Sequence, residues 1–323
     1  MLSRIADALY WMSRYLERAD NTARLVEINL LHLLEAEDVL SEAAQWRPLL
    51  GISGSQDAYQ QWSGGAEIGR QKVIQFMTQE RSNPNAIRSS LRLARENARV
   101  VRDRISREMW RAMNELWLEV ESQLRSPLVP ERAAGFYRLI RNSVARFHGL
   151  TVSTMIRGEA FGFYQLGTFV ERADMTARIL DVKYHLLLPD ASLVGSALDY
   201  YQWAALLKSL SGFEAYRRKF HRDFRPIDVA DFMIFETEFP RALRFSADRI
   251  AQALDIVGCP GESASSRTRA RLLEQLEEHS AERVFERGMH EFLSGFLADI
   301  GALHRALATD YFDTYVGGDR CDT

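Results

Sequence analysis

The chain has 323 residues, of which 46% are hydrophobic and 26% are charged, the balance of a folded protein. Its net charge of −3 and isoelectric point near 6.2 exclude a general attraction to nucleic acid or anionic membranes, so neither is expected as a partner. Two cysteines exclude a disulfide framework, no apolar run approaches the roughly 20 residues that cross a bilayer, and charges interrupt the N-terminal apolar stretch, so we expect a cytoplasmic protein.

Long stretches of 3.6-residue periodicity predict helices, with glycine and proline gathered between them. The first helix is predicted over 3–41, and a Gly/Ser-rich segment over 51–69 then breaks the pattern. Further helices are predicted over 84–107, 108–123, 130–155, 159–188 and 280–311. Because no segment alternates between apolar and polar residues as a strand does, the fold is predicted to be all-α.

Two segments of the chain, 16–34 and 170–188, resemble each other. Nine of their 19 aligned positions are identical, including the Glu-Arg-Ala-Asp sequence that begins at Glu17 and again at Glu171. The correspondence continues at nearly the same offset, through Pro84 and Pro240, to the C-terminal part of the chain.

The similarity predicts a tandem duplication of a helical-bundle unit with pseudo-twofold symmetry, because two copies of one apolar face can bury each other. We expect a single domain over 1–323 made of two repeats, about 1–157 and 158–312, with a frayed tail over 313–323.

Each copy of the long helix carries a charged stripe at seven-residue spacing. In the first copy the residues are Tyr10, Glu17 and Arg24, with Asp20 beside them. In the second copy they are Tyr164, Glu171 and Arg178, with Asp174 beside them. The stripes can be read as ion pairs that fix helix register or as a polar cleft lined by both copies. In either case, we predict that Glu17, Arg24, Glu171 and Arg178 lie largely buried in one cluster, each carboxylate contacting an arginine.

Five arginines in the helix predicted after Pro84 follow spacings of four and three, which places them on one helical face. They are Arg88, Arg92, Arg95, Arg99 and Arg102. Glu96 and Asp103 lie on the same predicted helix but do not cover the whole stripe. The stripe is therefore either a solvated or partner-facing surface, or a site for phosphate or carboxylate groups.

Motifs of complete catalytic sites are missing. The sequence has no phosphate-binding Gly-rich loop, no nucleophile elbow and no paired Glu-x-x-His, so we predict no cofactor and no metal and leave the catalytic residues unknown. His148 and His304 occupy equivalent positions, but their apolar flanks are typical of core or capping histidines. Glu17 and Glu171 could act as acid or base only if burial shifted a pKa.

Four stretches that together span the chain resemble the alpha-E domain family, bacterial all-helical proteins of poorly defined activity. They read LSRIADALYWMSRYLERADNTARLVE, NPNAIRSSLRLARENARVVRDRISREMWRAMN, TMIRGEAFGFYQLGTFVERADMTARIL and FPRALRF. The family's Glu-Arg pairs map onto Glu17-Arg18 and Glu171-Arg172, with Glu96-Asn97-Ala98-Arg99 between them. The chain departs from symmetry after Pro260, where the Arg-Glu-Asn-Ala-Arg segment has no counterpart.

These patterns give one set of candidate binding residues. The set is Tyr10, Arg14, Glu17, Arg18, Asp20, Arg24, Arg88, Arg92, Arg95, Glu96, Asn97, Arg99, Arg102, Tyr164, Glu171, Arg172, Asp174 and Arg178.

The resemblance also implies partners. Alpha-E proteins are typically encoded beside a circularly permuted ATP-grasp ligase and a transglutaminase-like protease, a combination that suggests a system for making or trimming amide-linked peptides. The expected role is an accessory or binding protein that holds the ligase, or presents to it an acidic peptide or phosphate-bearing ligand. The alternatives are an enzyme of the same pathway, with Glu17 or Glu171 as acid or base and arginines holding a carboxylate or phosphate, and a purely structural scaffold.

Overall fold

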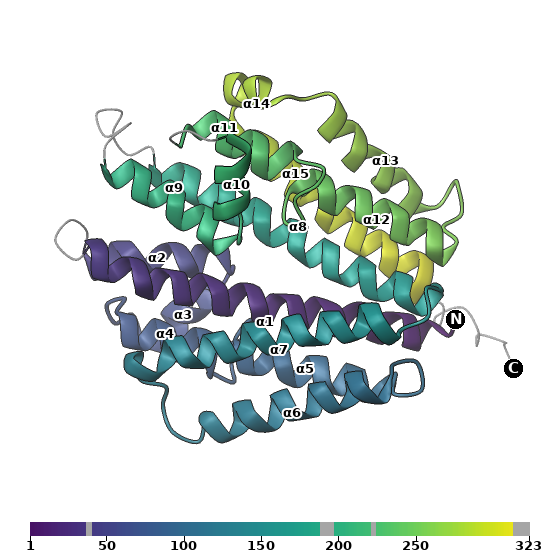
Figure 1. Cartoon of the computed structure of the whole chain (residues 1–323), viewed down its shortest axis with the longest axis horizontal. Helices are drawn as coiled ribbons and strands as arrows, with labels where there is room; N and C mark the ends of the chain where they lie inside the picture. The colour runs from purple at the N-terminus through teal and green to yellow at the C-terminus, as the bar shows by residue number, and fades with distance from the viewer. Residues whose placement is uncertain (37–40, 188–196, 221–223, 313–323) are drawn as a thin grey trace, which may run out of the picture.

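The computed structural model describes residues 1–36, 41–187, 197–220 and 224–312. Every regular element in these ranges is helical (Figure 1). The predicted all-α class is therefore confirmed for the described part of the chain. The predicted tail over 313–323 lies outside the described residues.

The two longest helices, α1 (Ser3–Ala36) and α8 (Glu159–Leu187), pack against each other through the middle of the molecule (Figure 1). The apolar spacing of α1 puts side chains such as Leu9 and Leu16 entirely inside the core. Close contact also requires Gly167 on α8, because a Cβ atom there would lie 2.1 Å from the carbonyl oxygen of Tyr10 on α1. The smallest residue therefore sets how closely the two helices approach.

Three longer helices cover the outer side of α1: α5 (Ile87–Val100), α6 (Arg107–Gln123) and α7 (Pro130–Thr154). Helices α5 and α7 contact α1 directly, and α6 packs against both of them. Pro130 begins α7, where its missing N–H is not needed. Ser106 caps α6 by accepting a hydrogen bond from the Met109 backbone N–H.

The outer side of α8 is covered in the same way by α12 (Leu243–Val257), α13 (Ala264–Glu277) and α15 (Met289–Leu307). Helices α12 and α15 contact α8, and α13 packs against both. The two sets of outer helices thus lie on opposite sides of the α1–α8 pair (Figure 1).

Shorter elements close the end of the molecule where α1 finishes and complete the C-terminal region. They are α2 (Glu42–Ile52), α3 (Gln56–Ser63), α4 (Arg70–Thr78), α9 (Ala197–Ser209), α10 (Phe213–Phe220), α11 (Pro226–Ala230), α14 (Ala281–Arg287) and the π-helical segments η2 (Asp231–Phe235) and η3 (Ala308–Phe312). Helices α2 and α9 each contact both long helices. Large side chains such as Trp46 and Tyr216 anchor these elements in a hydrophobic cluster that continues through the whole fold.

Three helix predictions were wrong in their bounds. Helix α5 ends at Val100, not near residue 107, because the chain turns there to bury Val101 and Ile105. The helix predicted over 280–311 is interrupted at Gly288, whose φ of 107° lies outside the helical range. The Gly/Ser-rich segment over 51–69 contains α3, which ends at Gly64 in the left-handed conformation.

Candidate functional site

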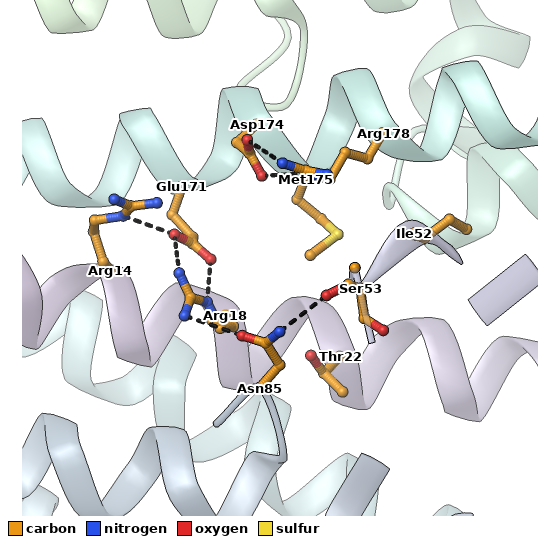
Figure 2. Close-up of a pocket in the computed structure, with 11 residues that line it drawn as sticks. Arg14, Arg18, Thr22, Ile52, Ser53, Asn85, Glu171, Asp174, Met175 and Arg178 are labelled. Carbon is orange, nitrogen blue, oxygen red and sulfur yellow. Dashed lines mark hydrogen bonds and ion pairs between the residues drawn. The ribbon is translucent and has the colours of Figure 1, made fainter. Parts of the chain in front are cut away.

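The charged centre of the molecule is the interface between α1 and α8, where two glutamates lie almost fully buried. Glu171 on α8 accepts hydrogen bonds from two arginines on α1 (Figure 2). Arg14 Nε lies 2.8 Å from one carboxylate oxygen, and Arg18 binds both oxygens at 2.6 and 3.0 Å. This bidentate fork is the strong form of an arginine–carboxylate pair.

Glu17 on α1 is held in the reciprocal way from α8. Arg172 donates to both of its oxygens at 2.9 Å. Arg241, which precedes α12, approaches one oxygen to 3.3 Å, and His148 Nε2 lies 3.4 Å from the other. Each buried glutamate therefore faces two arginines, at least one of them from the other long helix.

These contacts fix the protonation of both glutamates. Burial by itself would raise the pKa of Glu171, but Arg18 and Arg14 outweigh it and lower the pKa to about 2. Burial acts against Glu17 in the same way, and Arg172 and Arg241 hold its pKa well below the usual value. Both groups stay ionised at neutral pH with their lone pairs engaged, which does not suit a general acid or base.

The two aspartates of the charged stripes pair locally. Asp20 accepts from Arg24, and Asp174 accepts from Arg178, each one helical turn apart. Arg24 is buried, as predicted, but 40% of the Arg178 side chain is exposed, so the prediction that it is buried was wrong. It sits at the rim of a pocket rather than inside the cluster.

Two tyrosine–histidine pairs extend the polar interface. The hydroxyl of Tyr10 lies 3.0 Å from His304 Nδ1, and that of Tyr164 lies 2.6 Å from His148 Nδ1. Burial raises the pKa of Tyr10 to about 12 despite the nearby Arg14, and burial lowers the pKa of His304 to about 4. Each tyrosine hydroxyl is thus paired with a histidine ring nitrogen at the edge of the core.

A pocket of about 290 Å³ opens on the Glu171 side of the interface (Figure 2). Its walls come from α1, α8, the end of α2 and the segment before α5: Arg14, Arg18, Thr22, Ile52, Ser53, Gly54, Asn85, Glu171, Asp174, Met175 and Arg178. The sequence indicated the charged members of this set. It gave no indication of Ser53 or Asn85, which reach the pocket only through tertiary packing.

A matched position on the Glu17 side is filled by protein. Arg241 occupies the position in Pro240-Arg241-Ala242 that Asn85 occupies in Pro84-Asn85-Ala86. Its guanidinium donates to Asn21 Oδ1 at 2.6 Å and to Asp20 at 2.8 Å. Asn85 is too short to do the same, and instead its amide donates to the Ser53 carbonyl and accepts from Arg18. Comparison of these two sequence positions was the signal that could have located the pocket.

The arginine stripe of α5 is largely neutralised by neighbours. Arg88 binds Glu121 at 2.6 Å, Arg95 donates to Asn114 at 2.8 Å, and Arg99 pairs with Glu96 at 2.8 Å. Asn97 donates to the Leu93 carbonyl within the helix. The five arginines therefore do not form a single site that is free to bind an anion.

Two members of the predicted stripe behave differently. Arg102 lies beyond the end of α5, so it does not continue the helical face, and it stacks instead over the Trp110 ring. Arg92 is exposed on α5 and makes no hydrogen bond or ion pair with any described residue.

Within the described ranges, no group of three or more His, Cys, Asp or Glu side chains is placed to hold a metal ion. None of the helices in those ranges combines the length and the apolar composition that crossing a membrane requires.

Comparison with models of known families identifies one family. The model of Alpha-E, described as a predicted alpha-helical domain with a conserved ER motif, matches residues 1–312. Uncharacterized proteins of Mycobacterium bovis and of two Mycobacterium tuberculosis strains are 24–25% identical over 94% of this chain. The chain spans 36% of the length of these relatives, and no solved structure matches it significantly. The chain therefore belongs to the Alpha-E family.

Proposed function

We propose that this chain is an accessory binding protein of a bacterial peptide-ligating system, working in the cytoplasm with a circularly permuted ATP-grasp ligase. The observation that carries the binding role is the chemistry of the pocket between α1 and α8. Among the described residues, its lining contains no histidine, cysteine or lysine, and both carboxylates in that lining are paired with arginines. Such a pocket can hold a polar ligand but offers no activated nucleophile and no free base.

The ligase partnership rests on the family resemblance and is supported by two further observations. In the mycobacterial relatives, the segment that matches this chain makes up 36% of a longer chain, so it is covalently joined there to further protein sequence. In addition, Arg92 and Arg99 stand exposed on α5 and could dock an acidic patch of the ligase. A transglutaminase-like protease of the same system is a second expected partner.

We also infer that the single domain arose by tandem duplication of a helical-bundle unit, with repeats over about 1–157 and 158–312 and a pseudo-twofold axis between α1 and α8. Reciprocal contacts support this. Arg18 binds Glu171 while the matched Arg172 binds Glu17. In the same way, each tyrosine of the charged stripes bonds a histidine of the other repeat.

The partnership is tested by co-purification from the native host at low and at high salt, followed by identification of the bound proteins. We expect the ATP-grasp ligase at low salt and less of it at high salt, because exposed charge contacts are screened within about 8–10 Å. A matched bait in which Arg92 and Arg99 are both glutamine should recover less ligase than the wild type. Recovery of no ligase at either salt concentration would contradict the proposal.

A further inference from the structure

The pocket beside Glu171 is small and lined mainly by charged and polar side chains. We propose that it binds the carboxylate of an amino-acid-sized molecule, such as the terminal residue of a peptide, with Arg178 and Thr22 as its main donors. The inference rests on the proposed binding function and specifies what this site would present to the ligase.

The space between the helices is filled by a side chain beside Glu17 but is open beside Glu171. Near Glu17, the Arg241 side chain occupies the space between the helices and bonds Asp20 and Asn21. Near Glu171, the corresponding space is left open because position 85 is an asparagine. An occupant of the open pocket would therefore sit where the protein elsewhere places one of its own side chains.

A guanidinium fits the open pocket less well than Arg241 fits the site beside Glu17. Glu171 already receives its second arginine from Arg14, which reaches it along α1 and leaves the pocket space free (Figure 2). The acceptor that Asn21 offers to Arg241 is replaced by the thioether of Met175. A further cation would therefore find fewer acceptors here than Arg241 finds beside Glu17.

The net charge of the residues that line the pocket is positive. The charged residues that line the pocket in the described part of the chain are three arginines and two carboxylates, which leaves one positive charge: Arg14, Arg18, Arg178, Glu171 and Asp174. A monoanion would neutralise it at a site where both carboxylates are already paired.

Two hydrogen-bond donors at the pocket have no partner among the described residues. Arg178 uses Nε and Nη2 to hold Asp174, while its Nη1 has no hydrogen-bond partner among the described residues. The hydroxyl of Thr22, in a residue only 2% exposed, likewise makes no hydrogen bond within the described chain. The matched hydroxyl of Thr176 donates to the Arg241 carbonyl at 3.0 Å, so Thr22 lacks the partner that its counterpart has.

Size selects among anions. At about 290 Å³ the pocket lies at the lower end of the range for small-molecule sites, roughly 300–1,000 Å³. This volume accommodates one amino-acid residue. Met175 and Ile52 add an apolar wall against which a short side chain can pack.

The test is a ligand-observed NMR titration of the full chain at low ionic strength with four probes: N-acetylalanine, its uncharged amide N-acetylalaninamide, inorganic phosphate and agmatine. We expect N-acetylalanine to bind best and the amide to bind about tenfold or more weakly, since a hydrogen bond to a charged group contributes on that scale. Equal binding of acid and amide, or preference for phosphate or agmatine, would overturn the inference.

Two variants and one control locate the binding. Asn85→Met should fill the pocket with an uncharged side chain about as long as that of Arg241 and abolish binding of N-acetylalanine. Arg178→Gln, at a half-exposed position that tolerates change, should weaken binding about tenfold. The control Arg146→Gln, at an exposed ion pair with Glu115, should bind as wild type. If both pocket variants fold and still bind N-acetylalanine as wild type does, the pocket is not a carboxylate site. Failure of the ligase to co-purify, by itself, would contradict only the proposed partnership with the ligase.

Discussion

Replacing Glu171 with alanine should destabilise the protein by about 3–5 kcal/mol, because it leaves two arginine side chains, Arg14 and Arg18, only 10% and 18% exposed and without their carboxylate. The pKa of Glu171 gives a similar figure: a shift from 4.5 to about 2 corresponds to about 3 kcal/mol in favour of the ionised form. With unfolding entropy near 2.1 cal/mol/K per residue, the 323-residue chain should lose about 4–7 °C of Tm.

The assay is thermal unfolding followed by circular dichroism, with Glu115→Ala as the matched control. Glu115 pairs with Arg146 across α6 and α7, but their side chains are 50% and 59% exposed, so its loss should cost less than about 1 kcal/mol. The pH profile adds a second readout. Because the pKa of Glu171 is depressed in the folded state, its contribution is complete above pH 4.5 and should vanish as the pH falls to about 2.

A Glu171→Ala protein no less stable than the Glu115→Ala control would refute this reasoning. Suppose instead that the Glu171→Ala protein stayed folded but no longer supported amide-bond formation by the ligase. The buried cluster would then be a functional site and not only a set of ion pairs that holds α1 against α8.

The remaining predictions concern pH, close packing and the α5 surface. Burial lowers the pKa of His304 to about 4 in the folded protein, so stability should decline as the pH falls from about 6.5 to 4, measured by urea unfolding at each pH. Gly167→Ala should destabilise by at least about 1–3 kcal/mol in thermal unfolding, because its Cβ would meet the α1 backbone, whereas Gly149→Ala on α7 meets no atom within 4 Å and should be neutral or slightly stabilising. Changing Arg92 and Arg99 to glutamine should leave Tm within about 1 °C of wild type, as expected for exposed positions; a large loss would mean that both arginines support the fold.

Periodicity predicted the long helices well because each buries a continuous apolar stripe, as Leu9 and Leu16 do on α1. Helix ends were less predictable. Val100 ends α5 because Val101 and Ile105 bury themselves in a turn, a tertiary effect that local spacing does not contain.

The candidate site was predictable only in part. The repeated Glu-Arg-Ala-Asp sequence pointed to Glu17 and Glu171, and we expected Arg24 and Arg178 to lie in one buried cluster with them. Both of those arginines bind the aspartate one turn earlier instead, because that contact needs no second helix. Arg241 could not have been assigned to Glu17 from spacing, since 224 positions in the chain separate them.

The central claim, that this chain assists a ligase and performs no chemistry itself, is tested most directly by reconstitution. Amide-bond formation would be measured with the ATP-grasp ligase alone, with this protein alone, and with both together. We expect no turnover by this protein alone and faster or more selective ligation when both are present. Turnover by this protein alone that is lost in a folded Glu171→Gln variant would contradict this expectation and establish the buried carboxylate as catalytic.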